Sequence, residues 1–336
     1  MAKKKGKIRC AMLGYGGAFN MGKGHSDWIN AAPGMEAVAA CDLDAARMVA
    51  AKQDFPHFRT YTDVSRMLED DDIDLVVIIT PHDSHARLAV QCLNAGKHVV
   101  VEKPMCLTTA EATAMIEAAK KSNVVLTTFH NRRHDGDFMA IREVVQKGLL
   151  GEIFHLEAFM GGYGHPGHWW RSDKAISGGC FYDWGAHVVD WVLQLIPEKM
   201  ESVTGFFHKR VWTDVTNEDQ TQAIIRFKNG AMADIQMSNI AAIGKPRFRI
   251  LGTRGGLVDS WKDPFQVNTE VDGIRVSMEV KYMQSNWPAY YANLAKTLLD
   301  GAPLEVTPES SRRVIAVFET AEKSSKTGKA EKPAYE

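Results

Sequence analysis

Two short segments in the first third of the chain are apolar on both faces of the strand that each would form. Leu75–Ile79 and Val99–Val101 carry no polar side chain, and a strand without a polar face must be buried on both sides. Such strands are typical of parallel sheets covered by helices. Segments with helical character separate them from further expected strands at 8–13, 38–41 and 124–128. We therefore expect an α/β fold in which residues 1–128 form a doubly wound parallel sheet.

Glycines follow the first of these strands. Ile8–Leu13 runs directly into Gly14-Tyr15-Gly16-Gly17. Gly14 permits a tight turn, and Gly16 lets the backbone approach a pyrophosphate closely. Position 19, where a third glycine is usual, holds Phe19, so the loop should be longer than the shortest form. The pattern predicts a dinucleotide-binding Rossmann domain.

The second strand ends in an acid, Asp42. A carboxylate at this place accepts hydrogen bonds from both hydroxyls of an adenosine ribose and repels a 2′-phosphate. We therefore predict that the cofactor is NAD rather than NADP. The alternative is that Asp42 caps the helix expected to start at Leu43, and one carboxylate could do both.

A charged pair and a proline close the strand at Val99–Val101: Glu102, Lys103 and Pro104. Proline ends the ladder and restricts the residue before it to an extended backbone. Lys103 should therefore be held at the carboxyl end of the sheet, where open parallel sheets bind ligands. The alternative is that Glu102 and Lys103 are only solvated charges at the end of a strand.

The pattern changes after about residue 129. Alternating strands are expected from there on, at 153–159, 203–211, 221–227, 231–237, 248–251, 257–261 and 274–280. Alternation indicates an antiparallel sheet with two distinct faces, so residues 129–336 should form an α+β domain with a large, mostly antiparallel sheet. Apolar residues on both faces of 223–227 and 232–237 predict a homodimer or homotetramer. The tail from Lys326 is expected to be frayed.

The stretch from Gly161 to Asp190 is dense in side chains that suit a carbohydrate. Aromatic faces stack on sugar rings, and polar groups bond to hydroxyls. We predict that the substrate is a small carbohydrate and that its contacts are Lys103, Tyr163, His165, His168, Trp170, Arg171, Asp183 and His187. The alternative for Trp169 and Trp170 is that they pack in the core beneath a covering loop.

Asp183 and His187 are four residues apart, and Asp190 follows three residues later. In a helix all three would share one face. A carboxylate beside an imidazole fixes its tautomer and supports its action as a general base, so we expect the catalytic residues to be Lys103, Asp183 and His187. A rival hypothesis is a zinc site with four ligands: His165, His168, Asp183 and His187. That spacing is not the usual structural one, and we expect no metal.

Composition argues against several classes of partner. Lys and Arg number 40 against 41 Asp and Glu, so no global field attracts nucleic acid or an anionic membrane. No stretch approaches the ~18 apolar residues of a membrane span. Lys3–Lys5 precede only the short strand at 8–13, not a signal segment. The five cysteines are scattered, with no Cys-x-x-Cys pair. This usage is typical of a reduced, cytoplasmic setting.

Several motifs resemble the glucose–fructose oxidoreductase/inositol dehydrogenase/rhizopine catabolism (Gfo/Idh/MocA) family. They span nearly the whole chain: Thr80-Pro81-x-x-x-His85, Ala95-Gly96-Lys97-His98-Val99, Glu102-Lys103-Pro104, Asn131-Arg132-Arg133, Gly148-x-x-Gly151-Glu152-Ile153, Trp170-Arg171, Ser177-Gly178-Gly179, Asp183-x-Gly185-x-His187-x-x-Asp190 and Thr327-Gly328-Lys329. His82 stands where many members carry asparagine near the nicotinamide. The resemblance implies a nicotinamide-dependent oxidoreductase that acts on a sugar or cyclitol.

The resemblance also implies which residues bind the cofactor. They are Gly14, Tyr15, Gly16, Gly17, Asp42, Thr80, Pro81, His82, His85, Glu102, Lys103, Asn131 and Arg171. The expected activity is hydride transfer between a secondary hydroxyl of a sugar, glycoside or cyclitol and the nicotinamide. One alternative is NAD-dependent glycoside cleavage through transient oxidation at C3. Another is a non-catalytic dinucleotide or sugar sensor, which loss of Lys103 or His187 would have favoured.

Overall fold

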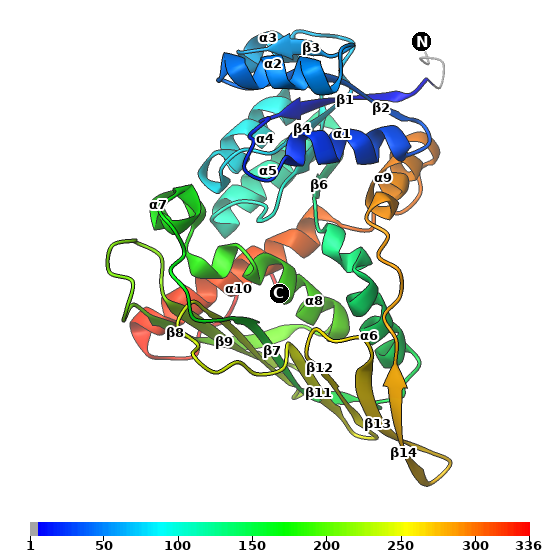
Figure 1. Ribbon diagram of the computed structural model, residues 1–336, viewed down its shortest axis with the longest axis vertical. Coiled ribbons are helices and arrows are strands. Elements are labelled where there is room, and N and C mark those ends of the chain that lie inside the picture. Colours follow the sequence, from blue (N-terminus) through cyan, green and yellow to red (C-terminus); the bar gives the residue numbers. More distant parts are fainter. Residues whose placement is uncertain (1–5) are drawn as a thin grey trace. The chain divides into compact units, whose positions relative to one another are not determined.

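The computed structural model describes residues 6–336, so Lys3–Lys5 lie outside the described residues. The chain divides into two compact units (Figure 1). The first unit comprises Met1–Cys106, Ala110–Asn131 and Trp287–Arg312, and the second comprises Leu107–Thr109, Arg132–Asn286 and Arg313–Glu336. After Asn131 the chain leaves the first unit for the long middle part of the second. The return of Trp287–Arg312 to the first unit was not expected from the sequence.

The first unit is built on a six-stranded sheet with the order β3-β2-β1-β4-β5-β6, in which all neighbouring strands are parallel. Its strands are β1 (Ile8–Leu13), β2 (Met35–Cys41), β3 (Arg59–Tyr61), β4 (Leu75–Ile78), β5 (His98–Val101) and β6 (Leu126–Thr128). All four residues of β4 are buried, and so are Val99–Val101 of β5. The predicted parallel sheet is confirmed.

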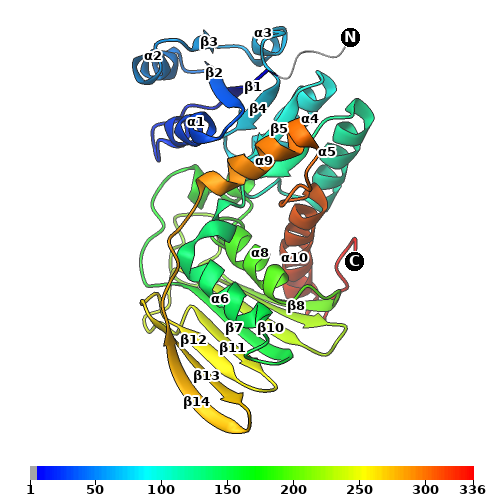
Figure 2. The same ribbon diagram turned by 90° about the vertical axis from the view of Figure 1, so that its right-hand side faces the viewer.

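Helices cover both faces of this sheet. They are α1 (Met21–Ala31), α2 (Ala45–Asp54), α3 (Val64–Leu68), α4 (His85–Asn94), α5 (Thr109–Ser122) and α9 (Pro288–Asp300), with a 3-10 turn η1 at His82–Ser84. Figure 2 shows α1 on one side of the sheet and α4 and α5 on the other. Tyr291 and Leu294 of α9 join Ile29 of α1 in one apolar cluster. The late segment therefore completes the core of the first unit.

The second unit contains an eight-stranded sheet with the order β14-β13-β12-β11-β7-β10-β9-β8. Its strands are β7 (Ile153–Gly161), β8 (Met200–His208), β9 (Gln220–Phe227), β10 (Met232–Ser238), β11 (Phe248–Gly252), β12 (Gly256–Asp259), β13 (Phe265–Val271) and β14 (Ile274–Val280). Only the β7–β10 pair is parallel, and the other neighbours are antiparallel. The predicted mostly antiparallel sheet is confirmed.

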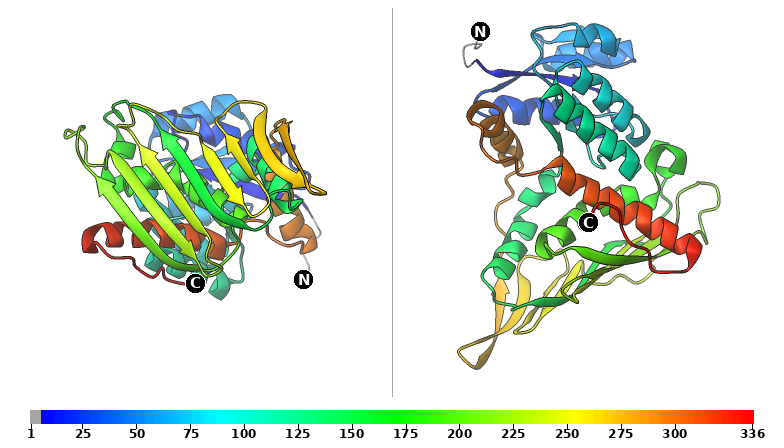
Figure 3. Two further views of the ribbon diagram at one scale, coloured as in Figure 1. Left: turned by 90° about the horizontal axis from the view of Figure 1, so that it is seen from below. Right: turned by 180° about the vertical axis from the view of Figure 1, so that it is seen from behind.

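Helices lie over one face of this sheet. The longer ones are α6 (Gly136–Gln146), α8 (Gly185–Leu195) and α10 (Pro308–Thr327), and the short ones are η2 (Asn131–His134), η3 (Trp170–Ser172), α7 (Lys174–Ser177) and η4 (Cys180–Tyr182). The left view of Figure 3 shows the opposite face, with the strands in front of the helices. Trp191 of α8 is fully buried and stacks on Phe138 of α6, with the ring centres 5.5 Å apart.

The face away from the helices is largely polar. Asp234 accepts a hydrogen bond from Gln222 (2.8 Å), and Arg249 pairs with Glu157 (2.9 Å). Two segments, 223–227 and 232–237, were expected to be apolar on both faces. On the face away from the helices their apolar residues are Ile224 and Met232, and both are half-buried.

Three features differ from the sequence expectations. β3 and β13 lie where no strand was predicted. β3 has three residues, too few to show a period, whereas β13 does alternate between buried and exposed positions. The tail after α10 is not frayed, because the backbone of Glu331 pairs with Val203 in both directions (2.8 and 2.9 Å). No helix within residues 6–336 is long and apolar enough to cross a membrane.

Candidate active site

The loop after β1 leaves room for a ligand. At Gly14, φ is +96° and a Cβ would lie 2.8 Å from the Ile79 carbonyl oxygen, so the position requires glycine. At Gly16 a Cβ would meet no atom within 4 Å, so packing inside the protein does not require glycine there. Close approach of a phosphate would require it. α1 begins only at Met21, which makes the loop long, as expected, and places a helix N-terminus after it.

Asp42 directly follows β2 and lies against this loop. Its carboxylate accepts hydrogen bonds from the N–H groups of Tyr15 (2.7 Å) and Asp44 (3.0 Å). Asp44 is the N-cap of α2, because its side chain accepts from the Ala46 N–H (2.9 Å). The helix-capping role considered for Asp42 therefore belongs to Asp44. Asp42 is fixed beside the glycine loop, and its carboxylate suits a ribose diol.

The turn after β4 is held together by its own polar groups. Ser84 donates to the Thr80 hydroxyl (2.6 Å). The ring nitrogens of His85 lie 2.8 Å from the carbonyl oxygens of Pro104 and Thr80. Burial lowers the pKa of His85, although these two contacts oppose the shift. Because His85 is fully buried, it fastens two strand ends together, and any effect of His85 on a cofactor is indirect.

Glu102 and Lys103 follow β5 at the same edge of the sheet. The Glu102 carboxylate accepts from the Lys103 N–H (3.0 Å) and faces His25 Nε2 at 3.0 Å. Burial raises the pKa of Glu102, but His25 and the Lys103 charge more than offset that effect and hold the pKa below its usual range. The alternative that Glu102 is only a solvated charge at the end of a strand is therefore wrong. Glu102 is a mostly buried anion, with 14% of its side chain exposed, that precedes the lysine.

In the second unit, α8 carries His187 and Asp190. His187 is 5% exposed, and its ring lies between those of Trp184 and Trp191, at centroid distances of 5.8 and 6.3 Å. Asp190 forms a buried ion pair with Arg133, whose Nε donates to it at 2.8 Å. Asp190 therefore anchors the helix, while His187 is held by aromatic rings.

Asp183 lies before α8 rather than within it. Its φ and ψ are −78° and −86°, and the helix begins at Gly185. The expectation that Asp183 and His187 share a helical face is therefore wrong. The Asp183 carboxylate lies 3.6 Å from Nε of Arg171. The proposed partnership of Asp183 and His187 in catalysis stays a prediction.

Aromatic rings of the 161–173 loop hold that arginine. The Arg171 guanidinium centre lies 5.0 Å from the Trp169 ring and 4.5 Å from the Trp170 ring. Tyr163 is 59% exposed and meets Trp212 edge to face at 5.7 Å. Trp169 is also exposed, at 38%, so the alternative of core packing is wrong for Trp169. These rings and the arginine form a polar–aromatic surface of the kind that binds sugars.

His165 and His168 meet an acid that the sequence analysis missed. Asp214 lies 3.1 Å from His165 Nε2 and 3.3 Å from His168 Nε2, and one ligand atom from each of the three residues falls within 4.8 Å of the others. The Gly167 N–H donates to His165 Nδ1 (3.0 Å), so neutral His165 carries its proton on Nε2. A metal-bound histidine normally donates its other N–H instead. The geometry favours a hydrogen-bonded cluster over a metal site.

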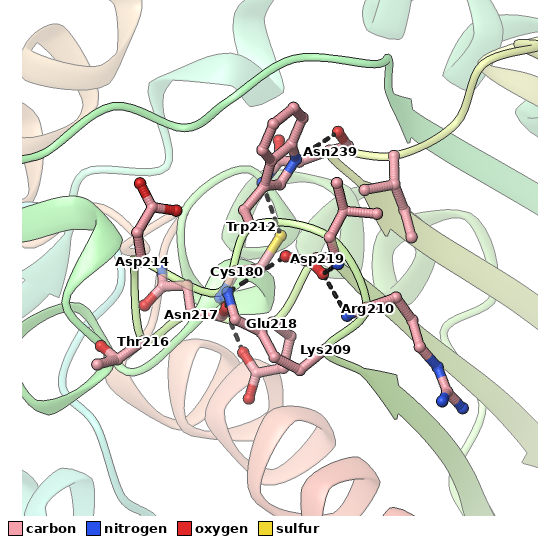
Figure 4. A network of polar contacts seen from close by, with 12 residues as sticks. Cys180, Lys209, Arg210, Trp212, Asp214, Thr216, Asn217, Glu218, Asp219 and Asn239 are labelled. Atoms are coloured by element: carbon pink, nitrogen blue, oxygen red, sulfur yellow. Dashed lines mark hydrogen bonds and ion pairs between the residues drawn. The ribbon is translucent and has the colours of Figure 1, made fainter.

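A second loop holds Asp214 in place (Figure 4). The Asp219 carboxylate accepts from the Arg210 and Val211 N–H groups, the latter at 2.6 Å, and from Lys209 Nζ at 3.2 Å. Trp212 donates its indole N–H to the Asn239 carbonyl (3.1 Å). No spacing rule connects this loop to His165, so only the fold could have revealed it.

The predicted site residues therefore gather in separate groups. In the first unit the carboxyl edge of one sheet brings together Gly14–Gly17, Asp42, Thr80–His85, Glu102 and Lys103. Asn131, at the end of that unit, is 7% exposed. In the second unit Asp183 lies beside Arg171, His187 lies on α8, and Tyr163, His165 and His168 lie around Trp212 and Asp214. Besides Asp214, the sequence analysis missed His25, which faces Glu102.

Two family models match this chain. One, described as an oxidoreductase family with an NAD-binding Rossmann fold, matches residues 8–130. The other, described as a GFO/IDH/MocA C-terminal domain, matches residues 138–258. Together the two matches cover well over half of the 336 residues.

Similar proteins include two inositol dehydrogenases. The scyllo-inositol 2-dehydrogenase (NADP(+)) IolW of Bacillus subtilis is 27% identical, over 84% of this chain and 85% of its own. The myo-inositol 2-dehydrogenase of Thermotoga maritima is 28% identical, over 85% of this chain and 87% of its own. Among solved structures, an NAD-binding protein from Listeria innocua superposes with a TM-score of 0.87 at 30% identity, over 98% of each chain.

Proposed function

The chain belongs to the GFO/IDH/MocA family of NAD-binding oxidoreductases, and on that premise we propose that it transfers a hydride between a secondary hydroxyl of a sugar, glycoside or cyclitol and a nicotinamide cofactor. One observation carries the proposal. The open glycine loop, Asp42 and Lys103 follow β1, β2 and β5 of one parallel sheet and therefore share its carboxyl edge, where such sheets bind dinucleotides. The names of two relatives, both inositol dehydrogenases, support the substrate class.

In this proposal each residue has one task. A nicotinamide cofactor held by the glycine loop and Asp42 would supply the acceptor for the hydride of the carbinol carbon. Lys103 donates a hydrogen bond to the reacting hydroxyl and stabilises the alkoxide charge that develops on it. His187 accepts the hydroxyl proton as general base, and Asp183 orients that histidine. The remaining substrate contacts come from the polar–aromatic loop: Tyr163, His165, His168, Trp170 and Arg171.

We further infer that NAD is preferred over NADP. The Asp42 carboxylate is held beside the glycine loop by two backbone N–H groups, and its negative charge disfavours a 2′-phosphate. Arg47 is the cation next to this loop, since a Cβ at Gly17 would lie 2.5 Å from its guanidinium. Asp44 lies 3.7 Å from Arg47 and counters part of its charge. Leu43, 88% exposed beside Asp42, offers an apolar surface to an adenine.

A panel assay tests the activity. The purified protein is incubated with NAD or NADP and with free inositols, free sugars and aryl glycosides, and both cofactor absorbance and released aglycone are followed. Net cofactor reduction with a free sugar or inositol, faster with NAD, is the expected result. Aglycone release without net reduction would replace the proposal with glycoside cleavage. Cofactor binding without either reaction would support the alternative of a non-catalytic sensor.

A further inference from the structure

A chain of polar side chains lies behind the lysine of the first unit. His25 of α1 is fully buried, and its Nδ1 lies 2.7 Å from the hydroxyl of Tyr291 on α9. Its Nε2 lies 3.0 Å from the Glu102 carboxylate, whose other oxygen accepts the Lys103 N–H at 3.0 Å. Three segments that are distant in the sequence therefore converge on the residue before Lys103.

The protons of this chain can be placed from its chemistry. Glu102 is ionised, since its pKa lies below the usual range, so the carboxylate only accepts hydrogen bonds. His25 therefore carries a proton on Nε2 and donates it to Glu102. Burial raises the pKa of Tyr291 well above its ordinary value, so its hydroxyl stays protonated and lies within hydrogen-bond distance of His25 Nδ1 (2.7 Å). With this assignment each of these polar atoms has a partner.

The ring of His25 has little freedom to move. Phe129 lies 4.3 Å from it and Trp28 5.5 Å, measured between ring centres. Aromatic packing on its faces and hydrogen bonds at both nitrogens fix one rotamer and one tautomer. A rotamer fixed in this way holds the Glu102 carboxylate in one orientation beside the backbone of Lys103.

We propose that His25 is a positioning residue that holds Glu102 as a fixed, mostly buried anion, so that Lys103 stays correctly placed for the substrate hydroxyl. The role of Lys103 toward the substrate rests on the proposed function. The role of His25 in holding Glu102 does not depend on that function. The titratable groups that face Glu102 are His25, Lys103, His85 and, beyond His25, Tyr291. Among them, His25 is the one whose ring N–H donates to the carboxylate.

Two substitutions remove the donor in different ways. His25→Phe keeps an aromatic ring among Trp28 and Phe129 but has no N–H. His25→Asn is smaller and polar, yet too short to reach Glu102. His25→Gln restores an N–H donor on a longer side chain. The matched control is His57→Phe, in the same unit, because His57 donates to the Ala37 carbonyl (3.1 Å) and not to Glu102.

The decisive measurement is the titration of the Glu102 carboxyl by ¹³C NMR on the full-length protein, with Glu102→Gln used to assign the signal. A hydrogen bond to a charged group is strong enough that its loss should raise the proton affinity of Glu102 about 10- to 100-fold in His25→Phe and His25→Asn. His25→Gln should recover most of the wild-type midpoint. An unchanged midpoint in the folded Phe or Asn variant, or an equal shift in His57→Phe, overturns the inference.

The pH profile of kcat/KM then connects this titration to the reaction. Protonated Glu102 no longer accepts the Lys103 N–H as a full negative charge, which loosens its hold on the backbone of Lys103. The acid limb should therefore move to higher pH in His25→Phe and His25→Asn and return in His25→Gln. An acid limb that stays in place while the Glu102 midpoint moves would contradict the role of Glu102 in positioning Lys103. If the wild-type protein turns over no member of the panel, the proposed function fails, and the NMR titration still decides whether His25 holds Glu102.

Discussion

Asp42 and Asp44 form a matched pair at the end of β2. Asp42 bonds to the glycine loop, whereas Asp44 caps α2.

We expect Asp42→Ala to weaken NAD binding about 10- to 100-fold, since hydrogen bonds from a ribose diol to a charged acceptor are lost. The same substitution should narrow the preference for NAD over NADP. Asp44→Ala should instead cost about 1 kcal/mol of stability and leave the affinity for NAD in place. Fluorescence titration with both cofactors measures the binding, and thermal denaturation measures the stability. Equal loss of NAD affinity in both variants would contradict this assignment.

The residues found from sequence and the residues missed differ in one respect. Gly14 and Asp42 directly follow a strand, and Lys103 is the second residue after one. A pattern in the neighbouring residues therefore located all three. His25 and Asp214 act through partners that only the fold brings close, Glu102 and the histidine pair. Asp183 shows the opposite failure, because its spacing to His187 suggested a helix that the backbone does not form there.

At the scale of elements, one buried arginine ties the second unit together. Arg247, just before β11, is 1% exposed and bonds both to Asp137 of α6 and, at 2.6 Å, to Asp259 of β12. Its guanidinium also lies 4.0 Å from the centre of the Trp261 ring.

Removing Arg247 leaves the buried charges of its partners uncompensated, so Arg247→Met should lower the free energy of unfolding by about 3–5 kcal/mol. Arg249→Met, two residues later on β11, is the control. Arg249 is half-exposed and pairs with Glu157 on the polar face, so its loss should cost at most about 1 kcal/mol. Chemical denaturation measures both, and equal losses would count against the buried network.

Acidic pH should destabilise the loop between β8 and β9, which carries Asp214. Burial raises the pKa of Asp219, but the Val211 and Arg210 N–H groups and Lys209 more than offset this and hold it below the usual range. The stability that this carboxylate gives is therefore complete above its ordinary pKa of about 3.9. It is lost as the pH falls through the lower, folded value. Trp212 fluorescence should change in that acid range, and Asp219→Asn should show the change already at neutral pH. A wild-type-like signal in Asp219→Asn would refute this account.

Strand prediction succeeded for most strands that were long enough, or apolar enough, to show a period, although β13 alternates as well and was missed. β4 and β5 were recognised because neither has a polar face, and β7, β9 and β10 because they alternate. β3 was missed because three residues hold no period. The tail from Lys326 was expected to fray because chain termini are often poorly ordered, and the pairing of Glu331 with Val203 shows what holds it.

At the scale of the whole molecule, we predict that the protein is at least a dimer. The face of the second sheet away from its helices is mostly polar, with Ile224 and Met232 among ion pairs and hydrogen bonds. Association through this face should therefore weaken at high salt. Light scattering at micromolar concentration and low salt should give at least twice the 37.3 kDa of one chain. A single-chain mass under those conditions would contradict the prediction.

The central claim is that a hydride leaves the substrate carbon with Lys103 and His187 acting on its hydroxyl. Transfer of deuterium tests it most directly, with an inositol or sugar deuterated at the carbinol carbons and mass spectrometry of the recovered cofactor. We expect the wild-type protein to place deuterium on NAD. Lys103→Met and His187→Ala should slow this transfer about 10²–10⁴-fold with NAD binding retained. His155→Ala, a half-buried histidine on the polar face of the sheet, should transfer at the wild-type rate. Wild-type protein that binds NAD yet leaves every deuterium on the substrate, or variants that transfer it at full rate, would contradict the account.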